Sequence, residues 1–224
     1  MDFNAYAPLA VLILAVTTLV ILTSPDWQLS IAFLALQYVG VFVLVAVTWP
    51  LAMSVTKLVT GWIAGAVLGM SITGLPSQAV SGNQDSTRPA RSRSLTSRTI
   101  AWFIAGNQPG GRLSGRLVRF FSAAMVGLAV LSVAPAATDL VSGLTVEQAL
   151  GGSLLIGMGL LQLGFAPTAL QIIIGLLTAT AGFEIFYAAV ETSTLVAGLL
   201  SVTNLGLALV GAYLLVAPNM EKDE

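Results

Sequence analysis

Long apolar runs without charges alternate with short polar breaks along this chain. A helix that crosses a membrane needs about 20 mainly apolar residues to cover roughly 30 Å of hydrocarbon. Lipid offers no partners to an open strand edge, and the runs lack the alternation of barrel strands, so they predict helices. The expected fold is an all-α, polytopic transmembrane bundle of about seven helices, at residues 7–23, 29–48, 51–72, 117–134, 149–165, 168–190 and 193–217.

A long polar stretch divides these runs into two groups. Residues 76–116 are rich in Ser, Gly, Pro and Arg, which is typical of a loop rather than of a packed element. We therefore expect three transmembrane helices in residues 1–75, a cytoplasmic loop at 76–116, four transmembrane helices in residues 117–218 and a cytoplasmic tail at 219–224.

The charged residues are few and segregated. Hydrophobic residues make up 56% of the chain and charged residues 8%, against roughly a quarter in soluble domains. Seven of the nine Lys and Arg residues lie between Arg88 and Arg119. The positive-inside rule places that loop and the C-terminus in the cytoplasm, and the N-terminus outside a bacterial-type plasma membrane. We interpret the first helix as retained, because the residues before it contain no Lys or Arg.

The basic region between Arg88 and Arg119 has a second interpretation. Arginines next to a membrane also attract anionic lipid or a cytoplasmic partner, so either is a candidate ligand of this region. Nucleic acid is not an expected partner, because a short basic loop between membrane helices is better explained as a determinant of topology.

The residue types that are missing exclude several kinds of chemistry. The chain has no Cys and no His, which excludes thiol catalysis, iron–sulfur ligation and Ser–His nucleophiles by its own residues. It also lacks a phosphate-binding glycine loop, and no predicted span contains an Asp. We therefore expect no catalytic residue, no cofactor and no metal.

Two ionisable residues lie inside predicted spans, where charge is costly and commonly functional. Lys57 and Glu184 each lie about seven residues from the outer end of their helix, which is roughly 10 Å below the membrane boundary at 1.5 Å per residue. This common depth predicts that they form a pair, directly or through water, and such a pair can load and release a proton. The alternative is that Lys57 extends to the boundary and Glu184 is a buried, protonated packing residue.

Three further polar residues complete the candidate proton path. Gln37 and Asn204 lie mid-span, where an amide either joins helices or lines a hydrated path. Glu191 ends the sixth run and is expected to meet water. The third run also carries Gly61, Gly65 and Gly69, a spacing that favours close approach of another helix.

Three segments in this order, residues 29–45, 52–69 and 169–190, resemble hydrogenase-4 component E. That family is related to the K-type membrane subunit of complex I and to the C-type subunit of Mrp sodium/proton antiporters. Gln37 matches a polar position of the family's second helix, and Thr56 and Lys57 match the threonine–lysine pair of its third. Two late glycines, Gly175 and Gly182, also match.

The chain departs from the family pattern at its acidic positions. Where the family usually has Glu-Asn-Gly, this chain reads Thr180, Ala181 and Gly182, and Glu184 lies one helical turn further on. The acids of the family's last helix have no counterpart, although Asn204 lies close to one of those positions.

The resemblance implies a non-redox membrane subunit of a proton- or sodium-translocating complex, with no catalytic chemistry of its own even where the complex is an oxidoreductase. Such a subunit would bridge antiporter-like subunits and contribute to an intramembrane proton path through Lys57, Glu184, Gln37, Asn204 and Glu191. One alternative is a structural membrane scaffold. Another is a stand-alone secondary transporter, which the lack of an internal sequence repeat disfavours.

Overall fold

The computed structural model describes residues 3–24, 26–74 and 112–220, and all the regular elements in them are helices. A short 3₁₀ turn, η1 (Phe3–Tyr6), leads into the first α-helix. The α-helices are α1 (Ala7–Thr23), α2 (Trp27–Val45), α3 (Leu51–Thr73), α5 (Arg112–Leu140), α6 (Val146–Phe165), α7 (Ala169–Val190) and α8 (Thr194–Met220).

Within the described residues, these seven α-helices are each long and apolar enough to cross a membrane. This confirms the predicted all-α bundle, and the bounds of α1 coincide with the predicted run. Residues 76–111 of the expected loop at 76–116 lie outside the described residues, and this part includes Arg88, Arg91, Arg93 and Arg98. The last four residues of the expected tail also lie outside the described residues.

The bounds of α5 correct the sequence-based expectation. The helix begins at Arg112 rather than at Leu117, and it continues through Pro135 to Leu140 instead of ending at residue 134. Proline removes only one backbone donor, and membrane helices commonly tolerate that loss. The turn between α5 and α6 is correspondingly short, and α6 begins behind a capping box that Thr145 and Gln148 form.

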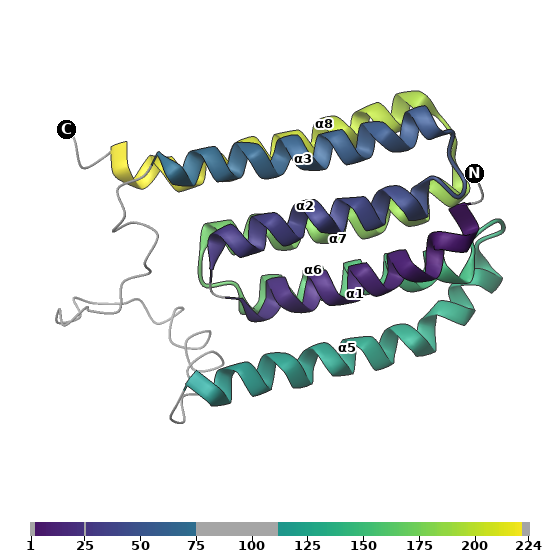
Figure 1. The fold of residues 1–224 in the computed structure, drawn as a ribbon, viewed down its shortest axis with the longest axis horizontal. Helices are drawn as coiled ribbons and strands as arrows, with labels where there is room; N and C mark the ends of the chain where they lie inside the picture. Colours follow the sequence, from purple (N-terminus) through teal and green to yellow (C-terminus); the bar gives the residue numbers. More distant parts are fainter. Residues whose placement is uncertain (1–2, 25, 75–111, 221–224) are drawn as a thin grey trace, which may run out of the picture.

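The helices form two layers of three, with α5 at one edge (Figure 1). One layer contains α1, α2 and α3, and the other contains α6, α7 and α8. Each helix of the first layer packs against one of the second, α1 on α6, α2 on α7 and α3 on α8. The beginning of α1 lies at one end of the bundle, whereas the end of α3, the start of α5 and the end of α8 lie at the other (Figure 1).

Glycines set the spacing between neighbouring helices. A Cβ at Gly159 of α6 would come within 2.6 Å of the backbone nitrogen of Ala179, so α6 and α7 approach backbone to backbone. On α3, a Cβ at Gly61 would overlap the ring of Tyr38, and Gly65 and Gly69 both face Ile31. The predicted small-residue face of α3 therefore packs against α2.

Candidate functional site

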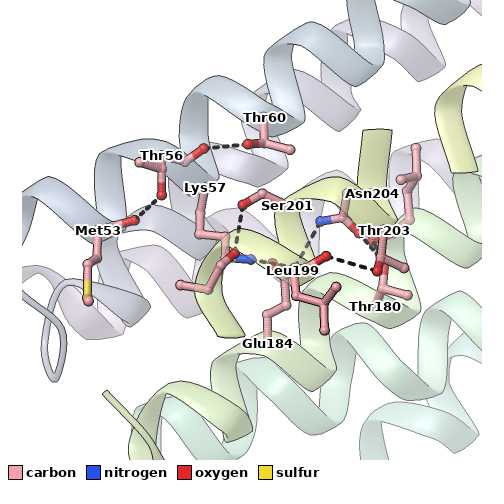
Figure 2. Close-up of polar contacts among 12 residues, drawn as sticks. Met53, Thr56, Lys57, Thr60, Thr180, Glu184, Leu199, Ser201, Thr203 and Asn204 are labelled. Atoms are coloured by element: carbon pink, nitrogen blue, oxygen red, sulfur yellow. Dashed lines mark hydrogen bonds and ion pairs between the residues drawn. The ribbon is translucent and has the colours of Figure 1, made fainter. Parts of the chain in front are cut away.

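A buried ion pair lies between the two layers of helices. Lys57 Nζ on α3 lies 2.9 Å from Glu184 Oε1 on α7, and each side chain is only 1% exposed (Figure 2). The two residues that were singled out for their depth therefore form a direct pair. The alternative in which Lys57 extends to the membrane boundary is wrong, because its ammonium group points inward to Glu184.

Helix periodicity accounts for these positions. Lys57 lies on the buried face of α3 with Ser54, Gly61 and Ala64, at the three- and four-residue spacing of one helix face. Glu184 lies on the buried side of α7, one turn from Ala181 and from Ala188. Small neighbours on both helices leave room for the lysine stem to cross from α3 to α7.

Asn204 of α8 joins the ion pair. Its Nδ2 donates a hydrogen bond of 2.9 Å to the Oε1 of Glu184 that also accepts from Lys57 (Figure 2). The Thr180 hydroxyl lies 3.2 Å from Asn204 Oδ1 and within 3.0 Å of the Leu176 carbonyl. Three helices thus converge on one carboxylate oxygen, and the second oxygen, Oε2, is buried without a partner among the described residues.

The charges of this site are balanced but costly. One ammonium and one carboxylate make the pair neutral, and their attraction offsets part of the free energy of removing them from water. Removing either partner would leave an uncompensated charge in an apolar interior. Each charge is therefore stabilised in this position mainly by the other, and a change in the charge of either group costs free energy.

Several other buried polar atoms near the centre of the bundle have no partner within the described part of the chain. Neither amide atom of Gln37 has one, and the hydroxyls of Tyr38 and Thr178 also lack one. Buried polar groups in native proteins are normally hydrogen-bonded, and where protein atoms are lacking the partner is ordered water. These atoms are thus positions where internal water would be stabilised.

The structure separates Glu191 from the ion pair. This residue is exposed and caps the end of α7, where its carboxylate accepts backbone hydrogen bonds of 3.1 Å from Thr192 and Ser193. Its backbone carbonyl accepts a hydrogen bond of 2.8 Å from Trp49 Nε1. Glu191 therefore lies at the end of the bundle, as expected from its position at the end of the run, and it does not contact Lys57, Glu184 or Asn204 in the hydrogen bonds of the described chain.

Reasoning from the sequence missed Thr180, Tyr38 and Thr178. Thr180 was treated only as the position where the related family has an acid, although it contacts Asn204. Tyr38 is adjacent to Gln37 in the sequence, but a tyrosine in an apolar run is usually a packing residue. The signal that could have identified Thr180 is its spacing of four residues from Glu184, which places both on one side of α7.

The fold and the site define an all-α bundle of the membrane-spanning type with a polar, ion-paired centre. No protein-family model, no curated protein and no solved structure matches the chain. The resemblance to hydrogenase-4 component E accordingly stays a prediction. In the described residues, no group of three or more acidic side chains could hold a metal ion.

Proposed function

We propose that this chain is a non-redox subunit of a proton- or sodium-translocating membrane complex in which Lys57 and Glu184 relay protons. The observation that carries this proposal is the buried ion pair, with Nζ and Oε1 2.9 Å apart. Ionisable groups within a membrane bundle are expensive to keep and commonly mark an ion pathway. Lys57, which the family resemblance matches, supports the same assignment, although Glu184 lies one helical turn from the family's usual acidic position.

The two oxygens of Glu184 have different roles in this relay. Oε1 is held by Lys57 and Asn204, whereas Oε2 has no partner in the described residues and is free to accept a proton. A proton that arrives on Oε2 converts the neutral pair into a lysine ammonium beside a carboxylic acid, with a net charge of +1. The proton leaves when a base on the exit side removes it, which restores the carboxylate and the original pair.

Water carries the proton to and from Glu184 in this proposal. The unpartnered atoms of Gln37, Tyr38 and Thr178 would stabilise water molecules between the helices. Glu191, exposed at the end of α7, is the candidate proton donor or acceptor at the boundary that the topology assigns to the outside. The adjacent subunits would be antiporter-like, in a bacterial-type plasma membrane with the N-terminus outside and the C-terminus in the cytoplasm.

The test measures proton movement by the complex that purifies with the chain, reconstituted in liposomes with a pH-sensitive dye. Glu184→Gln and Lys57→Ala should each reduce proton translocation at least tenfold while the subunits still assemble. Thr73→Ala is the control, because Thr73 lies on the same helix but is exposed, and among the described residues its hydroxyl contacts the Met70 carbonyl in α3. Normal translocation by assembled Glu184→Gln complexes would contradict the relay.

A second candidate function is a structural scaffold, which the absence of the family's usual acids favours. In that case the ion pair and Asn204 only hold α3, α7 and α8 together. Replacing the pair by apolar residues of similar size, Lys57→Met with Glu184→Leu, separates the two functions. A scaffold should keep full activity of the complex, whereas a relay should lose translocation while assembly persists. Uptake of an ion or solute by liposomes that contain only the purified chain would instead support a stand-alone secondary transporter.

A further inference from the structure

A small cavity opens at the end of the bundle where α1 is connected to α2 and α6 is connected to α7. Residues of α1, α2, α5, α6 and α7 line it, and its polar side chains are those of Ser30, Arg119, Gln162 and Gln171. The other lining residues are apolar, among them Phe165. The cavity measures about 20 Å³, which is room for about one water molecule or hydroxyl group. It lies within about two turns of these helix ends, and therefore near one end of the membrane-spanning helices rather than at their middle.

Arg119 brings an unpaired positive charge to this cavity. Its guanidinium group lies 5.9 Å from the centre of the Phe165 ring, and Nη1 donates a hydrogen bond of 3.2 Å to the Leu22 carbonyl. No carboxylate of the described residues forms an ion pair with it. Guanidinium has five N–H donors in a planar fork that matches phosphate, so most of its donors remain for a ligand.

Gln162 provides the second observation. Its side chain is only 5% exposed and lines the cavity, yet neither its Nε2 nor its Oε1 has a partner in the described structure. The amide therefore presents one free donor group and one free acceptor. Ser30 Oγ already donates to the Asp26 carbonyl at 3.0 Å, so toward the cavity it is an acceptor as well.

These groups fit a ligand that carries both an anion and a hydroxyl. We propose that the cavity binds the headgroup of an anionic phospholipid of the phosphatidylglycerol type. The phosphate lies on the Arg119 guanidinium at the mouth, and a glycerol hydroxyl enters the cavity, donates to Gln162 Oε1 and accepts from its Nε2. This site does not depend on the proposed proton relay.

The experiment measures binding of defined lipids to the delipidated full-length protein in neutral detergent, by native mass spectrometry and thermal unfolding. The wild-type protein should bind phosphatidylglycerol at least tenfold more tightly than phosphatidylcholine, and inorganic phosphate should not compete at millimolar concentration. Arg119→Gln should weaken binding of phosphatidylglycerol roughly tenfold, as expected for loss of a charge-assisted contact. Arg116→Gln is the matched control, because Arg116 is an exposed arginine one turn earlier on α5 and does not line the cavity.

Gln162→Leu tests the hydroxyl contact separately from the charge. This variant should lose the preference for phosphatidylglycerol over phosphatidic acid, which lacks the second glycerol, and still prefer both to phosphatidylcholine. If Arg119→Gln does not fold, Arg119→Lys replaces it and should show intermediate affinity, because lysine keeps the charge but not the planar fork. Equal effects of the Arg119 and Arg116 variants, or competition by free phosphate, would overturn the proposal.

Discussion

Thr180 of α7 lies within hydrogen-bonding distance of Asn204 of α8, with 3.2 Å between the hydroxyl and Oδ1 (Figure 2). Because a carboxylate only accepts hydrogen bonds, Nδ2 of Asn204 faces Glu184, which leaves Oδ1 on the side of Thr180. Thr180 of α7 thus contacts the same amide of α8 that donates to the Glu184 carboxylate one turn further along α7.

Removing the Asn204 amide should destabilise the bundle. Asn204→Ala deletes a buried hydrogen bond to a charged oxygen, and such bonds contribute about 1.5–3 kcal/mol. Thermal unfolding in detergent should therefore show a lower midpoint than for the wild-type protein. Thr203→Ala is the control, because Thr203 is adjacent and exposed and contacts only the Leu199 carbonyl. Equal midpoints for the two variants would show that Asn204 does not support the ion pair.

The two charges of the ion pair should be strongly coupled in stability. Lys57→Met alone leaves a buried carboxylate without its cation, and breaking a buried pair in this way costs about 3–5 kcal/mol. Adding Glu184→Leu should restore most of that loss, because two apolar side chains of similar volume need no desolvation. A double-mutant cycle measured by reversible unfolding in detergent checks this. Additive effects of the two substitutions would mean that the charges do not interact.

The contact of Gly61 with Tyr38 should make this position intolerant of side chains. A Cβ at Gly61 would overlap the Tyr38 ring, so Gly61→Val should force α3 away from α2 and cost about 1–3 kcal/mol or more. Gly198→Ala on α8 is the control, since a Cβ there meets nothing within 4 Å and alanine favours a helix by about 1 kcal/mol. A Gly61→Val variant as stable as the Gly198→Ala variant would be inconsistent with this packing.

The sequence was sufficient to predict the helices and the pairing of Lys57 with Glu184. Membrane thickness strongly restricts the length of the helices, and the cost of buried charge strongly restricts where ionisable residues lie in them. The predicted bounds of α5 were wrong at both ends. Arginines at the start and Pro135 near the end resemble loop signals, although the backbone stays helical there. The sequence also did not identify which amide would reach the pair. Gln37 and Asn204 both lie mid-span, but the rotation of each helix decides that Asn204 contacts Glu184 and Gln37 does not.

The unpartnered amide of Gln37 provides a test of whether water enters the centre of the bundle. Without water, its two buried amide atoms would each cost about 1–3 kcal/mol, so Gln37→Leu would stabilise the protein markedly and leave translocation unchanged. With water in the path, the substitution removes a group that holds this water, so translocation should fall several-fold with little gain in stability. Unfolding in detergent and proton uptake in liposomes distinguish the two outcomes.

Gln28→Leu is the matched control, because Gln28 lies on the same helix but is exposed. The proton relay predicts the second outcome, since Glu184 Oε2 is buried without a partner in the described residues and exchanges protons through water in this proposal.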